Sequence, residues 1–504
     1  MNLHRLILLV ITFFIGADFM YAHSLQTGIF DAHQDIGSPQ KSGSVDYSFG
    51  TQKYKISGSG RNMWFSEDEF HFLYKWIKGD FILYAQMDFM GKGVNPHRKA
   101  GVIIRKNLSS GSSHVNACVH GDGLTSLQYR KKQKMNTEEI QADIQAPEVI
   151  QLERHGDTYI MSVAKFGDPF ITEQISRISM GDSVVAGLYV CSHDSDVIES
   201  AVFKNVRIIY PADRNFIPYE DYIGSNIEIL NVSTGLRKIL YTDPGSLQAP
   251  NWHPSGLHLI YNSTGLLYHF DLLTSQIHQM ETGFATGNNN DHVLSSDGQQ
   301  LGISHHSDEH NGKSIIYILP SSGGEPKQIT SLGPSYLHGW SPDGRHLIYT
   351  AEHSGQFDIY KIAVDSGKEM QLTDTAGLDD GSEYTPDGKY IYFNSNRTGT
   401  MQIWRMRPDG KDQEQITFDE YNDWFPHISP DGKRILFLSY MPDIDSGEHP
   451  FYKHVYLRIM SLGCHKPEII AYVYGGQGTI NVPSWSPDSR YVAFISNSKI
   501  NKQL

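Results

Sequence analysis

Short runs of alternating apolar and polar residues occupy much of this chain, and one polar phrase recurs between them. In each copy an aromatic or apolar residue precedes Ser/Thr-Pro-Asp-Gly or a close variant, and a strand-like run follows. Trp340-Ser-Pro-Asp-Gly344, followed by His346-Leu-Ile-Tyr-Thr350, is an example. Alternation with a period of two is typical of β-strands rather than helices. The pattern therefore predicts many short strands joined by tight turns.

The phrase occurs six times at a nearly constant interval. The copies are Trp252–Gly256, Leu294–Gly298, Trp340–Gly344, Tyr384–Gly388, Ile428–Gly432 and Trp485–Ser489. They end at residues 256, 298, 344, 388, 432 and 489, so successive copies are 42, 46, 44, 44 and 57 residues apart. A repeat of roughly 40–50 residues with several short strands indicates a β-propeller in which each repeat is one blade. We predict a propeller over residues 217–496.

Each phrase has the composition of a turn between antiparallel strands. Proline fixes φ at the first corner, aspartate caps the turn, and glycine takes the positive-φ position. A second hairpin follows in each repeat, as at Phe357–Val364 and Lys368–Thr373, which gives four strands per blade. We expect the opening hairpin at 224–241 to pair with the final hairpin at 484–496. That pairing completes one blade, removes the open edge and gives six blades.

The repeats resemble those of one family. Trp-Ser-Pro-Asp-Gly hairpins followed by strands such as Asp358-Ile-Tyr-Lys361 are similar to TolB-type six-bladed propellers, with WD40-like or PD40 repeats. The resemblance implies a role in interactions within the bacterial envelope. Similar blades also occur in peptidase accessory domains and oligogalacturonate lyases, so the motif specifies a fold more than a function. TolB itself has a mixed α/β N-terminal domain, whereas residues 24–211 here have an all-β pattern. Membership of the Tol–Pal system is therefore not implied.

Residues 24–211 lack the repeat but are also predicted to be strands. The strand-like runs are Phe81–Phe89, Ala100–Arg105, His114–His120, Ser126–Arg130, Val149–Arg154, Tyr159–Ala164 and Val184–Val190. Seven or more short strands with Gly, Asn and Asp turns favour a two-sheet β-sandwich. Their order resembles concanavalin-like jelly rolls, many of which bind glycans. The predicted fold is all-β, an N-terminal jelly-roll sandwich followed by the propeller, with a short proline-punctuated junction that favours docked domains.

Residues 1–22 have the pattern of a secretory signal peptide. His4 and Arg5 precede the apolar run Leu6–Gly16, and Ala22 is a small residue suited to cleavage. The run is too short for a membrane span, and no cysteine follows it that could carry a lipid. We expect a periplasmic or secreted protein without a membrane span.

Charge and cysteine content limit the partners further. The net charge of −14 argues against nucleic acid, which would require a basic surface. An oxidising compartment would permit a Cys118–Cys191 disulfide, but two buried free thiols fit their apolar surroundings better. The third cysteine, Cys464, also lies in a strand-like context, and no Cys/His zinc spacing occurs.

One face of the propeller is the main candidate for a functional site. The connections that lead into each turn phrase gather around the central opening, so residues just before the phrases should converge from different blades. Many of the 24 histidines belong to these segments. The candidate ligand-binding residues there are Asp291, Tyr336, Asp380, Asp423, Trp424, Gln477 and Asn481. The candidate metal ligands are His292, His338, Glu383 and His427.

Three interpretations of this face stay open. In the first, His292, His338 and His427, with Glu383 or Asp380, bind manganese, zinc or calcium. A His-ligated metal at a comparable face of oligogalacturonate lyases supports this only by analogy. In the second, carboxylates and amides bind the hydroxyl groups of a glycan while Trp424 and Tyr336 stack on its rings. In the third, the histidines are structural and the face serves a protein partner or nothing specific.

The N-terminal domain offers a second candidate face. Arg105, His120 and Arg130 alternate with apolar neighbours on adjacent predicted strands, which would place them on one side of a sheet. A polar face of this kind suits carbohydrate binding. The alternatives are a solvated sheet face or a surface docked on the propeller.

The sequence contains no nucleophile elbow, phosphate loop or dinucleotide-binding fingerprint. We therefore predict an exported binding protein whose partner is an envelope protein or a polysaccharide. The alternative is a carbohydrate-active enzyme, a polysaccharide lyase or a glycoside hydrolase, that uses the His and Asp residues of the propeller face.

Overall fold

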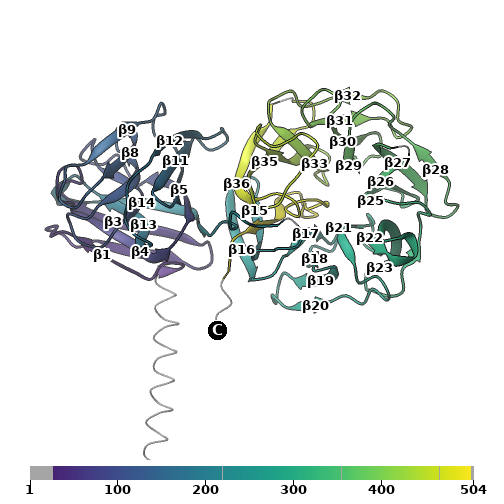
Figure 1. Ribbon diagram of the computed structural model, residues 1–504, viewed down its shortest axis with the longest axis horizontal. Helices are drawn as coiled ribbons and strands as arrows, with labels where there is room; N and C mark the ends of the chain where they lie inside the picture. Colours follow the sequence, from purple (N-terminus) through teal and green to yellow (C-terminus); the bar gives the residue numbers. More distant parts are fainter. Residues whose placement is uncertain (1–26, 218, 354, 465, 501–504) are drawn as a thin grey trace, which may run out of the picture. The chain divides into compact units, whose positions relative to one another are not determined.

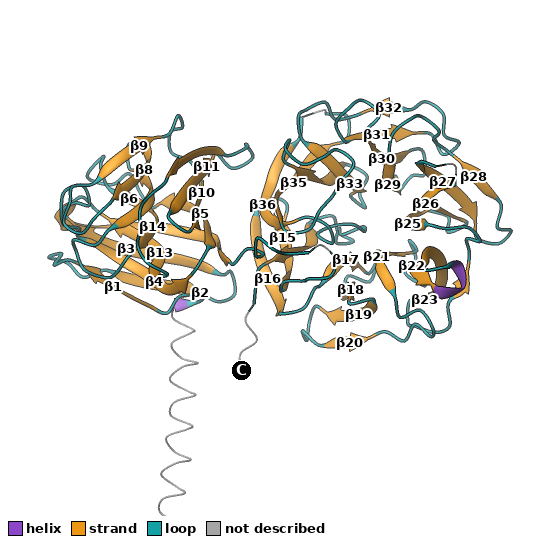
Figure 2. Cartoon of the chain, in the orientation of Figure 1, coloured by secondary structure: helices purple, strands orange, loops and turns teal. Residues whose placement is uncertain are grey.

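The computed structural model describes residues 27–217, 219–353, 355–464 and 466–500, which divide into two compact units at Tyr210 and Pro211 (Figure 1). Strands make up nearly all the regular structure of both units, and a short 3-10 helix, η1 (Asp308–His310), interrupts them (Figure 2). The predicted export signal lies outside the described residues. Within the described ranges, no helix has the length and apolar character needed to cross a membrane.

The first unit contains two antiparallel sheets of seven strands each. The strand order of the first sheet is β1 (Ala32–Ile36), β4 (Phe70–Lys78), β13 (Ser183–Cys191), β6 (Lys99–Arg105), β7 (His114–His120), β8 (Thr125–Arg130) and β9 (Glu138–Gln141). The order of the second is β12 (Ile171–Ile175), β11 (Thr158–Ala164), β10 (Val149–His155), β5 (Phe81–Phe89), β14 (Asp194–Ile209), β3 (Lys53–Gly60) and β2 (Ser44–Ser48).

One hydrophobic core joins the two sheets of this unit. Leu73 and Val102 from the first sheet pack in the same cluster as Ile56 and Leu83 from the second. The first sheet is also buried on its other face, where Phe70, Phe72, Ile103 and Tyr189 belong to a second cluster. Every residue of β6, β7 and β8 is buried, and on the other face of β7 and β8 the buried side chains include the polar His114, Asn116 and Gln128. The all-β prediction is confirmed, while the jelly-roll assignment stays a prediction.

Two of the three cysteines follow the favoured expectation, whereas Cys464 lies outside the strands, contrary to the strand-like context predicted for it. Cys118 and Cys191 are buried free thiols, and Cys464 is an exposed free thiol. Burial raises the pKa of Cys118 to about 12 and that of Cys191 to about 11, which makes both thiols poor nucleophiles.

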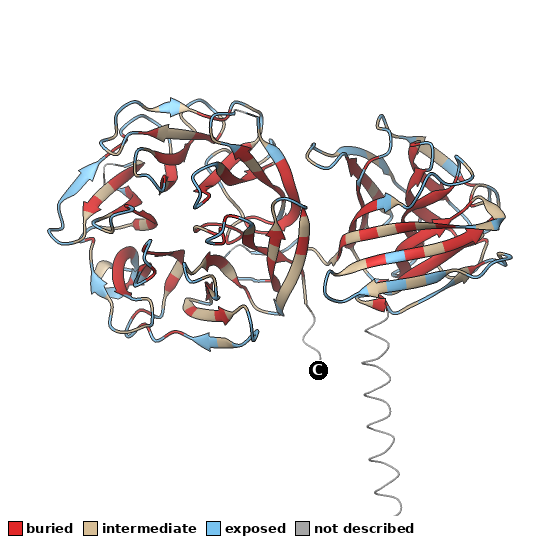
Figure 3. Cartoon of the chain, turned by 180° about the vertical axis from the view of Figure 1, so that it is seen from behind, coloured by how far each residue is buried: buried red, intermediate tan, exposed pale blue. Residues whose placement is uncertain are grey.

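The second unit is a six-bladed propeller. Five blades are four-stranded antiparallel sheets, shown here from the axis outward: β17 (Gln248–Trp252), β18 (His258–Ser263), β19 (Leu266–Asp271), β20 (Ile277–Gln279); β21 (Asn288–Leu294), β22 (Gln300–Ser307), β23 (Lys313–Pro320), β24 (Lys327–Gln328); β25 (Ser335–Trp340), β26 (His346–Glu352), β27 (Phe357–Ala363), β28 (Glu369–Gln371); β29 (Asp379–Tyr384), β30 (Ile391–Ser395), β31 (Gln402–Met406), β32 (Glu414–Gln415); β33 (Asn422–Ile428), β34 (Arg434–Tyr440), β35 (Lys453–Ser461), β36 (Glu468–Gly475). Figure 3 shows the buried strands nearest the centre of this ring and the exposed ones at its rim.

The sixth blade is shared between the two ends of the propeller segment. β15 (Ser225–Asn231) lies between β16 (Leu236–Asp243) and β37 (Tyr491–Asn497), with Ser225 opposite Asn497 and Asn231 opposite Tyr491. An isolated bridge from Trp485 to Val492 adds the innermost segment. The predicted pairing of 224–241 with 484–496 is confirmed, and with it the six blades.

The recurring phrase makes the predicted turn. In the copy at Ser341, the hydroxyl donates to Asp343 Oδ1 at 2.6 Å, and the Gly344 N–H donates to the Ser341 carbonyl at 2.8 Å. Gly344 has φ of 70°, which a Cβ would disfavour. The aromatic residue before the phrase ties one blade to the preceding one. Trp340 Nε1 donates to the Val293 carbonyl at 2.9 Å, and Trp485 Nε1 to the His427 carbonyl at 3.0 Å.

Candidate functional site

Four titratable side chains from four blades lie close together near the propeller axis. We call them the axial cluster. Asp291 comes from β21, His338 from β25 and Asp380 from β29, and His449 comes from the segment between β34 and β35. Asp291 is only 6% exposed, and His338 and Asp380 are also buried. The propeller topology brings these residues together because each innermost strand runs beside the same axis.

Direct contacts define the geometry of the axial cluster. His338 Nε2 lies 2.8 Å from Asp380 Oδ1. The Trp424 and Phe425 rings flank His449, with ring centroids 4.5 and 5.4 Å from its imidazole, and Phe425 also lies 6.2 Å from His338. The aromatic rings therefore surround the imidazoles with apolar surface, which strengthens electrostatic interactions inside the cluster.

The environment drives the pKa values of the axial cluster apart. Burial raises the pKa of Asp291 to about 7, because desolvation outweighs the opposing effect of the His338 charge. The Asp380 carboxylate raises this pKa further by repulsion. Burial alone would raise the pKa of Asp380, but the His338 charge and hydrogen bond lower it to about 2. The same ion pair raises the pKa of His338 despite its burial. Burial lowers the pKa of His449. At neutral pH the cluster thus holds one ion pair, a titrating carboxyl and a neutral imidazole.

Several buried polar atoms around the axis have no hydrogen-bond partner among the described residues. They are Asn290 Nδ2, His338 Nδ1, Ser382 Oγ, Trp424 Nε1 and His449 Nδ1. Buried polar atoms in native proteins nearly always have a partner, which can be protein, ordered water or a ligand. The axis therefore offers unused hydrogen-bonding groups in a site that is already desolvated.

A pocket of about 370 Å³ adjoins this cluster, and we call it the axial pocket. Its aromatic lining is Tyr219, Tyr222 and Phe451, and its amide lining is Gln248, Asn262, Asn288, Asn289, Asn290 and Gln477. Asn290 immediately precedes Asp291, and Gln477 hydrogen-bonds His449, so the pocket and the cluster share a boundary. Tyr336, whose pKa rises to about 12 through burial and the two nearby aspartates, lies at the same boundary.

The structure corrects the predicted metal site. His292 Nε2 lies 3.2 Å from the Ile260 carbonyl of the preceding blade. His427 contacts Glu383 Oε2 at 2.7 Å through Nδ1, and its other ring nitrogen contacts the Ile480 carbonyl. In the described ranges, no group of three or more His, Cys, Asp and Glu side chains is placed to hold a metal ion. Backbone carbonyls of neighbouring blades thus contact His292 and His427, and the third predicted histidine ligand, His338, pairs with Asp380.

Three of the predicted ligand-binding residues have structural contacts instead. Asp423 is fully buried, accepts from the Ser439 hydroxyl at 2.6 Å and pairs with Arg458 at 3.2 Å. Trp424 is also fully buried, so it cannot present a ring face to a sugar. Asn481 donates to Gln477 Oε1 at 3.2 Å and is positioned to orient that amide.

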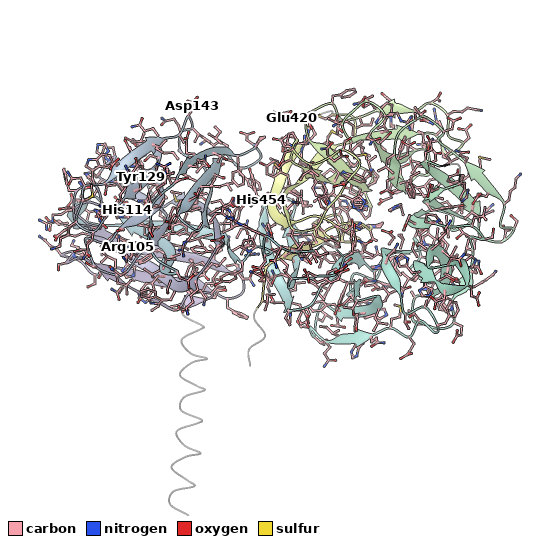
Figure 4. The ribbon with its side chains drawn as sticks, in the orientation of Figure 1. Arg105, His114, Tyr129, Asp143, Glu420 and His454 are labelled. Carbon is pink, nitrogen blue, oxygen red and sulfur yellow. The ribbon has the colours of Figure 1, made fainter. Side chains whose placement is uncertain are left out.

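The predicted ligand face of the first unit is also corrected. Arg105 and Arg130 are 0% exposed and pair with Asp68 at 2.6 and 2.7 Å. Arg105 and its cross-strand partner His114, both labelled in Figure 4, are buried. Loops cover the face, since Arg105 donates to the Ser109 carbonyl at 2.6 Å and Arg130 to the Phe65 carbonyl at 2.5 Å. His120 remains at the other end of the same strands, where it contacts Gln128.

The structure thus brings Asp291, Tyr336, His338, Asp380 and Gln477 together as candidates and adds residues that sequence reasoning missed. Those added are His449, Tyr219, Tyr222, Phe451 and several of the amides. One signal was available. The last repeat interval of 57 residues exceeds the others, and part of the excess is the long segment between β34 and β35, which carries His449 and Phe451.

Comparison with known proteins places the propeller among relatives. Residues 333–447 match the model of the TolB beta propeller domain. An uncharacterised protein from Agrobacterium fabrum is 46% identical over 272 residues, which is 54% of this chain and 92% of that protein. A solved structure from Agrobacterium tumefaciens, described as a candidate TolB, is 44% identical with a TM-score of 0.53, covering 56% of this chain and 100% of that one. TolB from Acinetobacter baumannii is 16% identical with a TM-score of 0.41, covering 65% and 79%, a likeness too low to bear on function.

Proposed function

This chain belongs to the family of TolB-type β-propellers, and from that premise we propose that it is an exported binding protein that holds a glycan in the axial pocket. The observation that carries the proposal is the lining of that pocket. Aromatic rings and side-chain amides surround a cavity of about 370 Å³, and unpaired buried polar atoms lie beside it. Ligand pockets commonly measure roughly 300–1,000 Å³ and combine apolar walls with a few polar groups.

A glycan fits this lining better than an apolar or strongly charged ligand. Each sugar hydroxyl both donates and accepts, and an amide side chain offers both kinds of partner. Tyr222, which is 42% exposed, and Tyr219 each pack edge-on against Phe451, with ring centroids 5.9 and 5.4 Å apart. These rings supply the apolar wall, while Asn290 and Gln477 supply hydrogen bonds at the opening of the axial cluster.

The proposal is tested by screening the full chain on a glycan array and measuring each hit by calorimetry. Tyr222→Ala and Asp291→Asn should each weaken binding of a hit by about tenfold or more, the loss expected for one good contact. Gln299→Ala is the matched control. Gln299 is exposed in the turn before β22, whereas the pocket is lined by His306 at the other end of that strand. If the array gives no hit and an envelope protein is captured through the same pocket residues, the ligand is a protein and not a glycan.

A second candidate function, acid–base catalysis on a polysaccharide, rests on the divergent pKa values of the axial cluster. A carboxyl that titrates near neutrality beside a His–Asp ion pair is the arrangement expected of a general acid or base. The full chain would then release reducing ends from a hydrolysed polysaccharide, or products with the ultraviolet absorbance of an unsaturated uronate. Asp291→Asn would abolish turnover. Binding without turnover assigns the cluster to recognition alone.

The remaining expectations belong to the same proposal. We propose residues 24–211 as a jelly-roll module and residues 217–496 as the ligand-binding propeller of a periplasmic or secreted protein. A polysaccharide or an envelope protein is the partner, and nucleic acid is not, because the net charge is −14.

A further inference from the structure

Four basic side chains gather in the first unit, and we call them the basic cluster: His97, Lys99, His120 and His193. Lys99 begins β6 and lies directly opposite His120 at the end of β7. Lys99 also lies opposite Cys191 at the end of β13, two residues before His193. Three neighbouring strands therefore end at the same point of the sheet.

The basic cluster is compact and only its rim is accessible. Lys99 is 2% exposed, and its Nζ lies 3.3 Å from His193 Nδ1. The His97 ring is exposed and lies 5.4 Å from the His193 ring and 6.0 Å from the His120 ring, measured between centroids. His120 Nδ1 is buried and has no hydrogen-bond partner among the described residues.

Of the acidic side chains near the basic cluster, exposed Asp122 accepts from the Leu124 N–H at 3.1 Å, and Glu199 and Glu139 are engaged elsewhere. Glu199 binds Arg98 at 2.7 Å and accepts from the Val94 N–H at 2.8 Å. Glu139 accepts from Gln128 at 3.4 Å and from Gln141 at 2.8 Å. Among the described residues, no carboxylate lies within 4.0 Å of Lys99, although every other lysine or arginine this buried in the unit has an acidic or carbonyl partner.

A buried ammonium without a counter-charge is costly, because protein interiors solvate an isolated charge poorly. The Lys99 charge also disfavours protonation of the neighbouring imidazoles. Burial and then the Lys99 charge lower the pKa of both His120 and His193 to about 4, so both rings are neutral at pH 7. A neutral imidazole can still donate one N–H, so the basic cluster offers N–H donors beside a positive charge.

We propose that the basic cluster binds an oxyanion, of the carboxylate or sulfate type that acidic sugars carry. The anion pairs with Lys99 and accepts hydrogen bonds from the imidazoles of His120 and His193, while His97 closes the exposed side. A charge-assisted hydrogen bond of this kind is stronger than a neutral one. The inference rests on the first unit alone and is independent of the function proposed for the propeller.

The test uses the full chain and two probes, sodium glucuronate and sodium sulfate, against sodium chloride at equal ionic strength. Calorimetry should show saturable binding of at least one probe beyond the chloride control. Lys99→Met should weaken it by about tenfold or more, the effect of losing one hydrogen bond to a charged group. Lys131→Met is the matched control, because Lys131 follows β8 of the same sheet and pairs with Glu138 at an exposed site.

Two readings separate ligand binding from a structural role. If Lys99 binds an anion, Lys99→Met should not lower the melting temperature measured in the absence of a probe. The substitution removes an uncompensated buried charge. His97→Ala, at an exposed position, should weaken binding without a change in melting temperature, and it keeps the test valid if Lys99→Met folds poorly. Tighter binding of glucuronate than of sulfate identifies a carboxylate ligand, and the reverse identifies a sulfate. Wild-type binding no stronger than in chloride, or unchanged binding in both variants, would overturn the proposal.

Discussion

Two groups of buried charged side chains, one in each unit, differ in how completely they are hydrogen-bonded. In the first unit, Asp68 pairs with Arg105 and Arg130, and backbone carbonyls accept from the remaining guanidinium N–H groups. In the axial cluster, His338 and Asp380 pair with each other, while Asp291 has no ion-pair partner within 4.0 Å among the described residues. The first group is a closed structural network, and the second leaves capacity for a ligand.

The difference follows from what covers each group. The arginines lie on a sheet face that loops seal, so their guanidinium N–H groups must find partners inside the protein. Asp68 keeps its charge there. Burial would raise its pKa, but the Arg105 and Arg130 charges and the Arg130 hydrogen bond lower it. The axial cluster adjoins a pocket through Asn290, whose unpaired Nδ2 belongs to a residue of the pocket lining. His114 is the exception in the closed network, because its ring nitrogens have no hydrogen bond there.

The largest effect expected is on the closed network. Asp68→Asn should lower the free energy of unfolding of the first unit by about 3–5 kcal/mol, because two arginines would lose their buried counter-charge. Urea unfolding followed by probes for each unit measures this. Glu69→Gln is the control. Glu69 follows Asp68 in sequence and pairs with exposed Arg61, so this substitution should cost about 0–1 kcal/mol. Equal effects of the two substitutions would contradict the structural role given to Asp68.

Two histidines of one blade should separate stability from binding. His292→Ala should lower the free energy of unfolding of the propeller by about 1–3 kcal/mol, because it leaves the Ile260 carbonyl without its partner. It should not change glycan affinity. His306 is exposed and lines the axial pocket, so His306→Ala should weaken binding and leave stability unchanged. If His292→Ala lost glycan binding and kept full stability, His292 would be a ligand-binding residue and not a structural one.

Much of the fold could be predicted from sequence, because turn chemistry and strand period are local. The six phrases specified the blades, and the incomplete hairpins specified the closure between β15 and β37. Register also placed Asp291, His338 and Asp380 near one axis. Local patterns do not reveal what else a side chain contacts, so the carbonyl partners of His292 and His427 went unrecognised.

The residues that sequence reasoning misplaced depend on distant loops. Period-two alternation put Arg105 and Arg130 on one sheet face correctly, but it could not show that Asp68 and the loops around it bury that face. Trp424 was expected at a surface and is fully buried against His449, which the repeat pattern does not include. Both errors concern segments that meet only in the folded protein.

The axial cluster should make the free energy of unfolding depend on pH. Asp291 has an unfolded-state pKa near 3.8 and a folded-state pKa of about 7, so the folded protein holds this proton over a range where the unfolded chain has lost it. The contribution of Asp291 to the free energy of unfolding should therefore fall as pH rises from about 4 to about 7. Urea unfolding at several pH values should show a weaker dependence in Asp291→Asn. Asp412→Asn, at an exposed pair with Arg407, is the control. Identical profiles for wild type and Asp291→Asn would contradict the buried, unpaired carboxyl.

The smallest expected effect is on stability, at a turn residue outside both groups of buried charged side chains. Gly344 has φ of 70°, and a Cβ there would meet no atom within 4 Å. Gly344→Ala should therefore lower stability by about 1–2 kcal/mol through backbone conformation alone. It should leave glycan and anion binding unchanged. A thermal shift larger than that of Asp68→Asn would show that the turn, and not the charged network, limits stability.

The central claim is that the axial pocket holds the ligand, and a crystal structure with the tightest-binding oligosaccharide tests it most directly. The predicted result is a sugar ring beside Tyr222, with hydroxyl groups within hydrogen-bonding distance of Asp291, Asn290 or Gln477. The contradictory result is an oligosaccharide bound elsewhere at saturating concentration, with ordered water alone on the polar atoms of the axial cluster.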